Sequence, residues 1–98
     1  MYRVTAFSIV GPYQLEVSFD DGVTRLIDFS EVLEGYYRAP LKDLNLFNAV
    51  RLDHEFHTLV WPNDADFDPA DLHDWPEVKD EFIAKARQWA REGKSSPR

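Results

Sequence analysis

The sequence predicts an α+β protein, an antiparallel meander sheet of about five short strands with short helices and one C-terminal helix. Apolar and polar residues alternate along residues 14–19 and again along 23–29, which is the period of half-buried strands. Turn and cap residues separate these short segments from one another. Residues 74–93 change to helical spacing between an acidic cap and a glycine. A chain of 98 residues is expected to form one domain.

The hairpin "QLEVSFDDGVTRLIDF" is the strongest local signal. A three-residue loop, Asp20–Gly22, would place all the apolar residues of its two strands on one face, although it turns Arg25 inward. A two-residue loop would turn Ile27 outward, so we expect the three-residue loop, with Gly22 in the left-handed region. The apolar residues in question are Leu15, Val17, Phe19, Val23, Ile27 and Phe29.

Three further strands are expected, at Arg3–Ile9 and in the segments "AVRLD" and "TLVW", with "HEFH" joining the last two. A short helix is predicted at 31–33, capped by Ser30 and ended by Gly35. A second is predicted in "LKDLNLF", where three apolar residues stand at helical spacing. These residues are Leu41, Leu44 and Phe47.

The last third of the chain carries two helix starts. Asp68 is expected to cap a short helix with Pro69 at its first position. Asp74 with Glu77 three residues later predicts the start of the C-terminal helix, which Gly93 ends. One apolar stripe, formed by Val78, Phe82, Ala86 and Trp89, should dock this helix. We therefore expect residues 1–76 to form an α+β domain, and 77–98 a helix and frayed tail packed on it.

Composition limits the classes of function. The chain has no cysteine, which excludes disulfides and thiolate zinc sites and fits a cytoplasmic protein. No stretch resembles a signal peptide or a membrane span, so no membrane partner is expected. Residues 1–78 hold five Lys/Arg against fifteen Asp/Glu, a net charge of −10, whereas residues 79–98 hold six against three, a net of +3. An acidic body repels phosphate backbones and attracts basic proteins, so direct nucleic-acid binding is not expected.

The Asp-rich stretch "NDADFDPADL" invites a metal-site interpretation. Asp64, Asp66 and Asp68 match the first ligand positions of an EF-hand loop, but Pro69 stands where that loop needs glycine and Trp75 where it needs glutamate. Turn and cap chemistry is therefore the favoured interpretation, with a weak surface cation site as the alternative. His54 and His57 lie in a turn without further ligands, and His73 has no evident partner. No catalytic residue, metal ligand or cofactor is predicted.

The segments "LEVSFDDG", "IDFSEVL" and "LVWPNDADFDPADL" resemble domain-of-unknown-function family 2442, an uncharacterised bacterial group, over about residues 2–75. The most specific part of this resemblance is the Trp-Pro-Asn, Asp, Asp-Pro and Leu pattern of residues 61–72. The resemblance implies a small strand-rich fold with no established activity. Its members are often encoded beside another small protein, as toxin–antitoxin pairs are. This chain departs from the family pattern at Asp64, where glycine is usual, so the turn after Asn63 is expected to be strained or altered.

These observations favour a non-enzymatic protein-interaction module, antitoxin-like, that binds a small basic protein. Residues of the types that dominate interfaces give the candidate partner-binding set. This set comprises Tyr36, Tyr37, Arg38, Trp61, Asn63 and Asp66. For the aromatic members, packing against the core is the competing interpretation, and Trp61 in particular could pack under the turn that follows it. The alternative functions are a small enzyme or a ligand- or metal-binding domain around Asp66, and a homodimer with a purely structural role.

Overall fold

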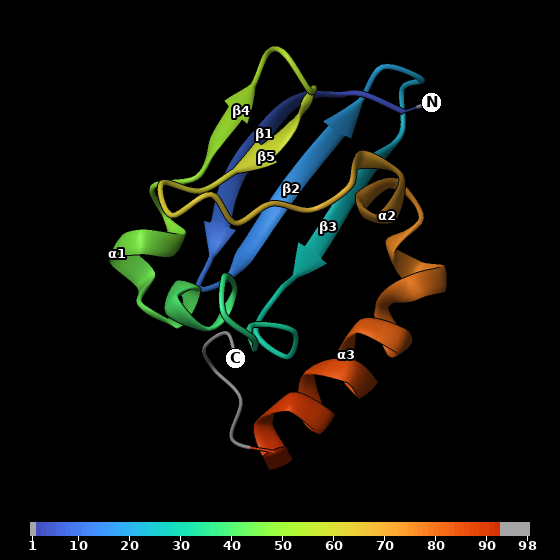
Figure 1. The fold of residues 1–98 in the computed structure, drawn as a ribbon. Coiled ribbons are helices and arrows are strands. Elements are labelled where there is room, and N and C mark those ends of the chain that lie inside the picture. Colours follow the sequence, from blue (N-terminus) through green and yellow to red (C-terminus); the bar gives the residue numbers. More distant parts are fainter. Residues whose placement is uncertain (1, 93–98) are drawn as a thin grey trace.

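The computed structural model describes residues 2–92 and confirms the α+β class, with five antiparallel strands, short helices and a C-terminal helix (Figure 1). Along the chain the elements are β1 (Val4–Gly11), β2 (Gln14–Phe19), β3 (Thr24–Asp28), a 3-10 helix (Ala39–Lys42), α1 (Leu44–Phe47), β4 (Arg51–Asp53), β5 (Thr58–Val60), α2 (Pro69–His73) and α3 (Trp75–Glu92). The five strands do not share one sheet. β1, β2 and β3 form a three-stranded sheet in that order, while β4 and β5 form a separate pair.

The β2–β3 hairpin has the register that the alternation of apolar residues predicts. Ser18 is paired with Thr24, so the loop between Phe19 and Val23 holds three residues. Gly22 in this loop takes φ +89°, a conformation that glycine adopts without steric cost. Four residues of the hairpin that face the core are at most 3% exposed, namely Leu15, Val17, Phe19 and Ile27, and Val23 packs against the core half-buried. The three-residue loop is therefore confirmed.

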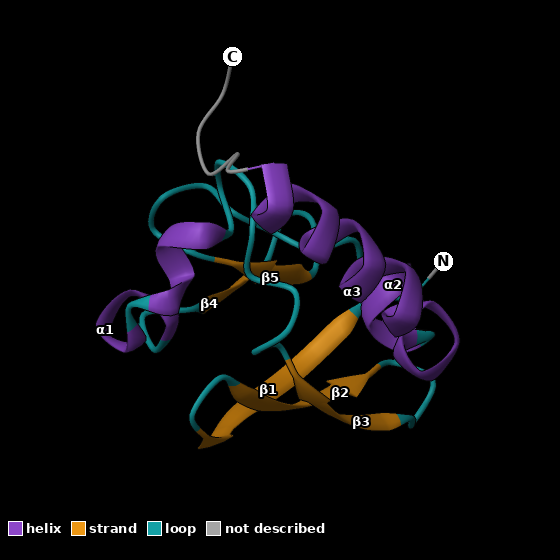
Figure 2. Cartoon of the chain, turned by 90° about the horizontal axis from the view of Figure 1, so that it is seen from below, coloured by secondary structure: helices purple, strands orange, loops and turns teal. Residues whose placement is uncertain are grey.

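The three-stranded sheet is covered on one face. Figure 2 shows the β4–β5 pair and the helices on the same side of this sheet. Burial agrees with this arrangement, because Val17 on the covered face has no exposure whereas Leu26 on the opposite face is 68% exposed. The two sheets are joined where Val4 N donates to His57 O across 2.9 Å.

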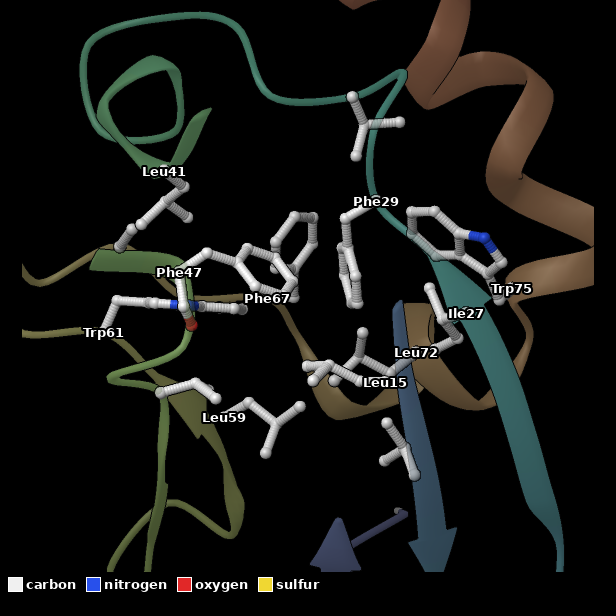
Figure 3. Packing of buried hydrophobic residues seen from close by; sticks show 14 of the residues in the cluster. Leu15, Ile27, Phe29, Leu41, Phe47, Leu59, Trp61, Phe67, Leu72 and Trp75 are labelled. Carbon is white, nitrogen blue, oxygen red and sulfur yellow. The ribbon is translucent and has the colours of Figure 1, made fainter. Parts of the chain in front are cut away.

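Aromatic rings fill the space between these layers (Figure 3). Phe29, which follows β3, lies at the centre, and four ring centroids stand 5.1–6.2 Å from its own. These rings belong to Phe47, Phe67, Trp61 and Trp75. Trp61 has no exposed surface, and its Nε1 donates to Phe47 O across 2.8 Å, so its one polar atom is satisfied in the core.

The helix predicted at residues 31–33 is absent, and the segment forms a single turn instead. Ser30 does not act as an N-cap; its backbone N–H donates to Asp28 Oδ1 at 2.9 Å, so the aspartate closes a local turn in place of a helix. Val32 N then donates to Phe29 O, which completes the turn. Phe29, Val32 and Leu33 are all buried, so the apolar pattern that suggested a helix is satisfied by one turn.

The helix predicted around 41–47 is divided into the 3-10 helix and α1. Asp43 separates them with an extended backbone, and its side chain accepts from Asn45 N to cap α1. Leu41 and Phe47 are fully buried, but Leu44 is 38% exposed. The three apolar residues therefore lie in two short helices, and they do not form one buried face.

The start of α2 and the inward face of α3 follow the prediction. Asp68 caps α2 through a bond from Ala70 N to Oδ1 at 2.8 Å. The predicted stripe of α3 faces inward, with Ala86 buried and Val78, Phe82 and Trp89 half-buried. The predicted boundary at residue 76 falls inside the first turn of α3, which begins at Trp75. The predicted tail lies beyond residue 92, outside the described residues. None of the helices within residues 2–92 has the length and apolar character that a membrane crossing requires.

Candidate functional site

The two exposed tyrosines stand on a turn between β3 and the 3-10 helix. Gly35 opens this turn with φ +91°, and its carbonyl accepts from Ala39 N at 3.0 Å. Tyr36 and Tyr37 are 49% and 53% exposed, and their rings meet edge to face with centroids 4.8 Å apart. Edge-to-face contact is a favourable arrangement of aromatic rings, so each tyrosine helps to fix the other.

Two side chains hold this turn against the loop that follows β5. Asn63 Nδ2 donates to Tyr37 O at 2.8 Å, while Asn63 Oδ1 accepts from Ala65 N at 3.2 Å. An Arg38 terminal nitrogen donates to Asp66 O at 3.3 Å. The structure therefore brings together five of the six predicted partner-binding residues. We call them the tyrosine surface: Tyr36, Tyr37, Arg38, Asn63 and Asp66.

Arg38 is the anchor of this surface. Its guanidinium carbon lies 4.1 Å from the centre of the Phe67 ring and 5.3 Å from that of Phe82, so the cation rests on two aromatic faces. Burial lowers the pKa of Arg38 below its usual value, while the charges of Asp66 and Asp71 act in the opposite direction. Arg38 is thus a half-buried, structural cation under an acidic surface, and its guanidinium is already engaged within the fold.

Trp61, the sixth predicted residue, does not belong to this surface. It has no exposure and is packed in the aromatic core, where Nε1 binds the Phe47 carbonyl (Figure 3). The structure therefore favours the interpretation that the ring packs under the following turn. A partner cannot reach Trp61 in this conformation, and we leave it out of the surface.

The Asp-rich loop has architectural roles. Asp64 takes φ +70° in a tight turn in which its N–H donates to Trp61 O, consistent with a position where glycine is favourable. Asp68 caps α2, and Asp66 gives its backbone carbonyl to Arg38. Burial and the charge of Asp68 raise the pKa of Asp71 above its usual value. Across residues 2–92, no three His, Asp or Glu side chains are grouped so that they could hold a metal ion.

His73 is the residue that sequence reasoning missed. The sequence showed no evident partner for it, but its Nε2 lies 2.7 Å from Asp21 Oδ2 and its Nδ1 lies 2.9 Å from Asp74 Oδ1. Arg25, turned inward as the hairpin phase requires, donates from Nε to His73 O at 2.7 Å. Asp74 therefore uses its carboxylate on His73, while its backbone carbonyl accepts from Glu77 N in the first turn of α3. The contact between His73 and Asp21 joins positions 52 residues apart, and no sequence motif indicates it.

Comparison with family models finds a match over most of the chain. The model of the family described as "Protein of unknown function (DUF2442)" matches residues 4–76 of the 98-residue chain. This match covers both sheets, the turn that carries the tyrosines, the Asp-rich loop and α2. Most of α3 lies beyond it. No curated protein and no solved structure matches the chain.

Proposed function

The chain belongs to the DUF2442 family, and we propose that it is a non-enzymatic interaction module that binds a small basic protein through the tyrosine surface. The partner that we propose is the product of an adjacent gene, as in bacterial toxin–antitoxin pairs, with both proteins in the cytoplasm. The observation that carries the proposal is the pair of half-exposed tyrosine rings on a turn that two hydrogen bonds, from Asn63 to Tyr37 O and from Arg38 to Asp66 O, hold against the loop after β5.

Preorganisation supports this role for the tyrosine pair. Tyrosine is among the residues that contribute most to interface energy, and ordering a mobile loop on binding would cost part of that energy. Here the Tyr37 carbonyl is already bound by Asn63, and Arg38 is held over Phe67. The rings can therefore enter a complex with little further ordering of the backbone.

Charge supports a basic partner. The net charge of residues 1–78 is −10, and the carboxylates of Asp64, Asp66 and Asp68 are exposed beside the tyrosine turn. Complementary charge mainly raises the association rate and the specificity of a complex. The cation that follows Tyr37 in the chain, Arg38, is half-buried and engaged with Phe67 and the Asp66 carbonyl, so it does little to oppose a basic partner.

Isothermal titration calorimetry and stopped-flow mixing with the adjacent gene product test the proposal. The double variant Tyr36→Ala/Tyr37→Ala should bind about 30-fold more weakly, since loss of an interface hot spot costs about 2 kcal/mol or more. Phe56→Ala is the matched control, because Phe56 is an exposed ring (69%) on the β4–β5 turn and should leave affinity unchanged. Association should slow between about 0.1 M and about 1 M salt, as screening shortens from about 10 Å to about 3 Å.

Each outcome has a defined meaning. If the two proteins do not bind, the pairing is wrong. If they bind but the double variant keeps its affinity while Phe56→Ala loses it, the pairing holds and the assigned surface is wrong. An association rate that does not change with salt concentration would contradict the proposal that the acidic charge speeds association. Light scattering of the chain alone tests the competing homodimer, and a dimer that the double variant disrupts would replace the basic protein by a second copy.

A further inference from the structure

His73 stands at the end of α2, where three separate parts of the chain meet. Its side chain is 9% exposed, and each of its two ring nitrogens faces a carboxylate oxygen. Asp21 comes from the β2–β3 loop, and Asp74 is the residue that links α2 to α3. The ring of Tyr2 lies over the imidazole, and Phe19 of β2 meets the imidazole edge to face at 5.0 Å.

The two carboxylate contacts define the proton content of the ring. A neutral imidazole has one N–H donor and one acceptor nitrogen, whereas an imidazolium has two donors. Ionised carboxylates only accept hydrogen bonds. With Asp21 Oδ2 at 2.7 Å from Nε2 and Asp74 Oδ1 at 2.9 Å from Nδ1, both contacts are hydrogen bonds only if both nitrogens carry a proton. In the neutral ring, one of the carboxylates would face a nitrogen lone pair.

The stacking of Tyr2 gives a second, independent argument for the cation. The centroids of Tyr2 and His73 are 3.6 Å apart and the rings are inclined by only 3°, which is a face-to-face arrangement with little offset. Two neutral aromatic rings avoid this arrangement because their electron-rich faces repel each other. A cation over an aromatic face is instead attracted to it. The geometry of Tyr2 therefore fits an imidazolium better than a neutral imidazole.

We propose that His73 is a proton-controlled latch: as a cation it holds the β2–β3 loop and the Tyr2 segment against α2, and on losing a proton it releases them. The contact with Asp74 is between neighbours in the chain, whereas the contact with Asp21 spans 52 positions. The contacts that should open are therefore those to Asp21 and Tyr2. This latch does not depend on the proposed partner.

The charged groups around the ring set the direction of the pH effect. The hydrogen bond to Asp74 raises the pKa of His73, burial opposes the rise, and Asp21 adds to it. On the other side of the pair, a bond from Val23 N and the contact with His73 lower the pKa of Asp21. Arg25 also lies at this point, and it binds the His73 carbonyl rather than the ring. Because the folded pKa of His73 is raised, the latch contributes stability below pH about 6.5 and loses it as pH rises through the folded value.

Nuclear magnetic resonance of the full chain tests the proposal. Long-range ¹⁵N–¹H spectra of the imidazole should show two protonated nitrogens in His73 at pH 6, with a titration midpoint above the ordinary value of about 6.5. In Asp21→Asn the midpoint should move down, since a carboxylate that favours the cation is lost. The same titration should move the Tyr2 ring signals. A His73 ring with a single N–H at pH 6, or Tyr2 ring signals that do not change as His73 titrates, would refute the proposed latch.

Hydrogen exchange separates the latch from ordinary packing. Gly22 N donates to Phe19 O and Val23 N donates to Asp21 Oδ1, so their protection factors report whether the β2–β3 loop is held. The protection of both amides should fall as His73 deprotonates. In Asp21→Asn the protection of Gly22 N should be lower and should no longer change with the titration of His73. His54→Gln is the control, because His54 is exposed on the β4–β5 turn, and it should behave as the unmodified chain. Loop protection that is independent of pH would show that the loop is held without His73.

Discussion

Gly35 lies directly against the indole of Trp89, so that a Cβ added at Gly35 would meet two ring carbons of Trp89 at 2.9 Å. This contact joins the turn that carries the exposed tyrosines to the C-terminal half of α3. Gly35 also has φ +91°. The position therefore requires glycine for two independent reasons, backbone conformation and space.

Gly35→Ala should destabilise the chain by more than Gly22→Ala. Both glycines are left-handed, at φ +91° and +89°, so each substitution carries a backbone cost of about 1–2 kcal/mol. Nothing lies within 4 Å of a Cβ at Gly22, whereas Trp89 must move at Gly35, which adds about 1 kcal/mol or more. Urea unfolding of both variants measures the difference, and adding Trp89→Ala should remove it. Equal costs in the two single variants would mean that α3 does not press on the turn.

The N-cap of α2 should be worth about 1 kcal/mol. Asp68→Ala removes the acceptor of Ala70 N, and loss of an N-cap usually costs 0.5–2, typically about 1 kcal/mol. Asp68→Asn keeps an oxygen at the same place and should stay within about 0.5 kcal/mol of the unmodified chain. Urea unfolding at neutral pH checks both. A large loss in Asp68→Asn would show that the charge of Asp68, and not the cap, matters there.

The sequence predicted those parts of the fold whose signals are local. The β2–β3 loop followed from the phase of the apolar residues and from Gly22, and the α2 start followed from Asp68 and Pro69. The prediction of a helix at 31–33 was wrong because the Asp28 side chain accepts a hydrogen bond from the Ser30 backbone and closes a turn. Composition alone does not tell whether such a turn is more stable than a helix. The division of the strands between two sheets depends on layer packing, which alternation along one strand does not report.

The candidate site was predictable to a similar extent. Residue type selected Tyr36 and Tyr37, which are exposed, but the same rule selected Trp61, which is buried among the aromatic rings of the core around Phe29. The His73 contacts could not be predicted, because they join positions that are brought together only by the folded chain. Exposure and long-range pairing are properties of the assembled layers, so sequence periodicity carries little information about them.

Phe82→Ala should test how firmly α3 is docked. The Phe82 ring is stacked on Trp75 at 5.2 Å and lies 5.9 Å from Phe67, but it is only half-buried. We expect a loss of about 2 kcal/mol, below the 3–5 kcal/mol usual for fully buried phenylalanine. Phe56→Ala makes the same change at a ring that is 69% exposed and should cost far less. Similar small losses in both variants, measured by thermal unfolding, would make α3 an arm that is weakly attached to the rest of the chain.

Asp71→Asn should stabilise the chain at neutral pH and lose this effect in acid. Burial, and then the charge of Asp68, raise the folded pKa of Asp71 above its ordinary value of 3.8. The folded state therefore binds this proton more tightly than the unfolded state, so the contribution of Asp71 to stability is present below pH 3.8 and is lost as pH rises through the folded pKa. Asparagine is neutral at every pH and avoids that loss. The gain should be on the order of a few tenths of a kcal/mol, since solvent screens a half-exposed charge.

Asp80→Asn removes the same charge from an exposed position of α3 and serves as the control in urea unfolding at pH 7 and pH 3. Destabilisation by Asp71→Asn at pH 7 would show that the attraction between Asp71 and Arg38 outweighs the burial and the repulsion.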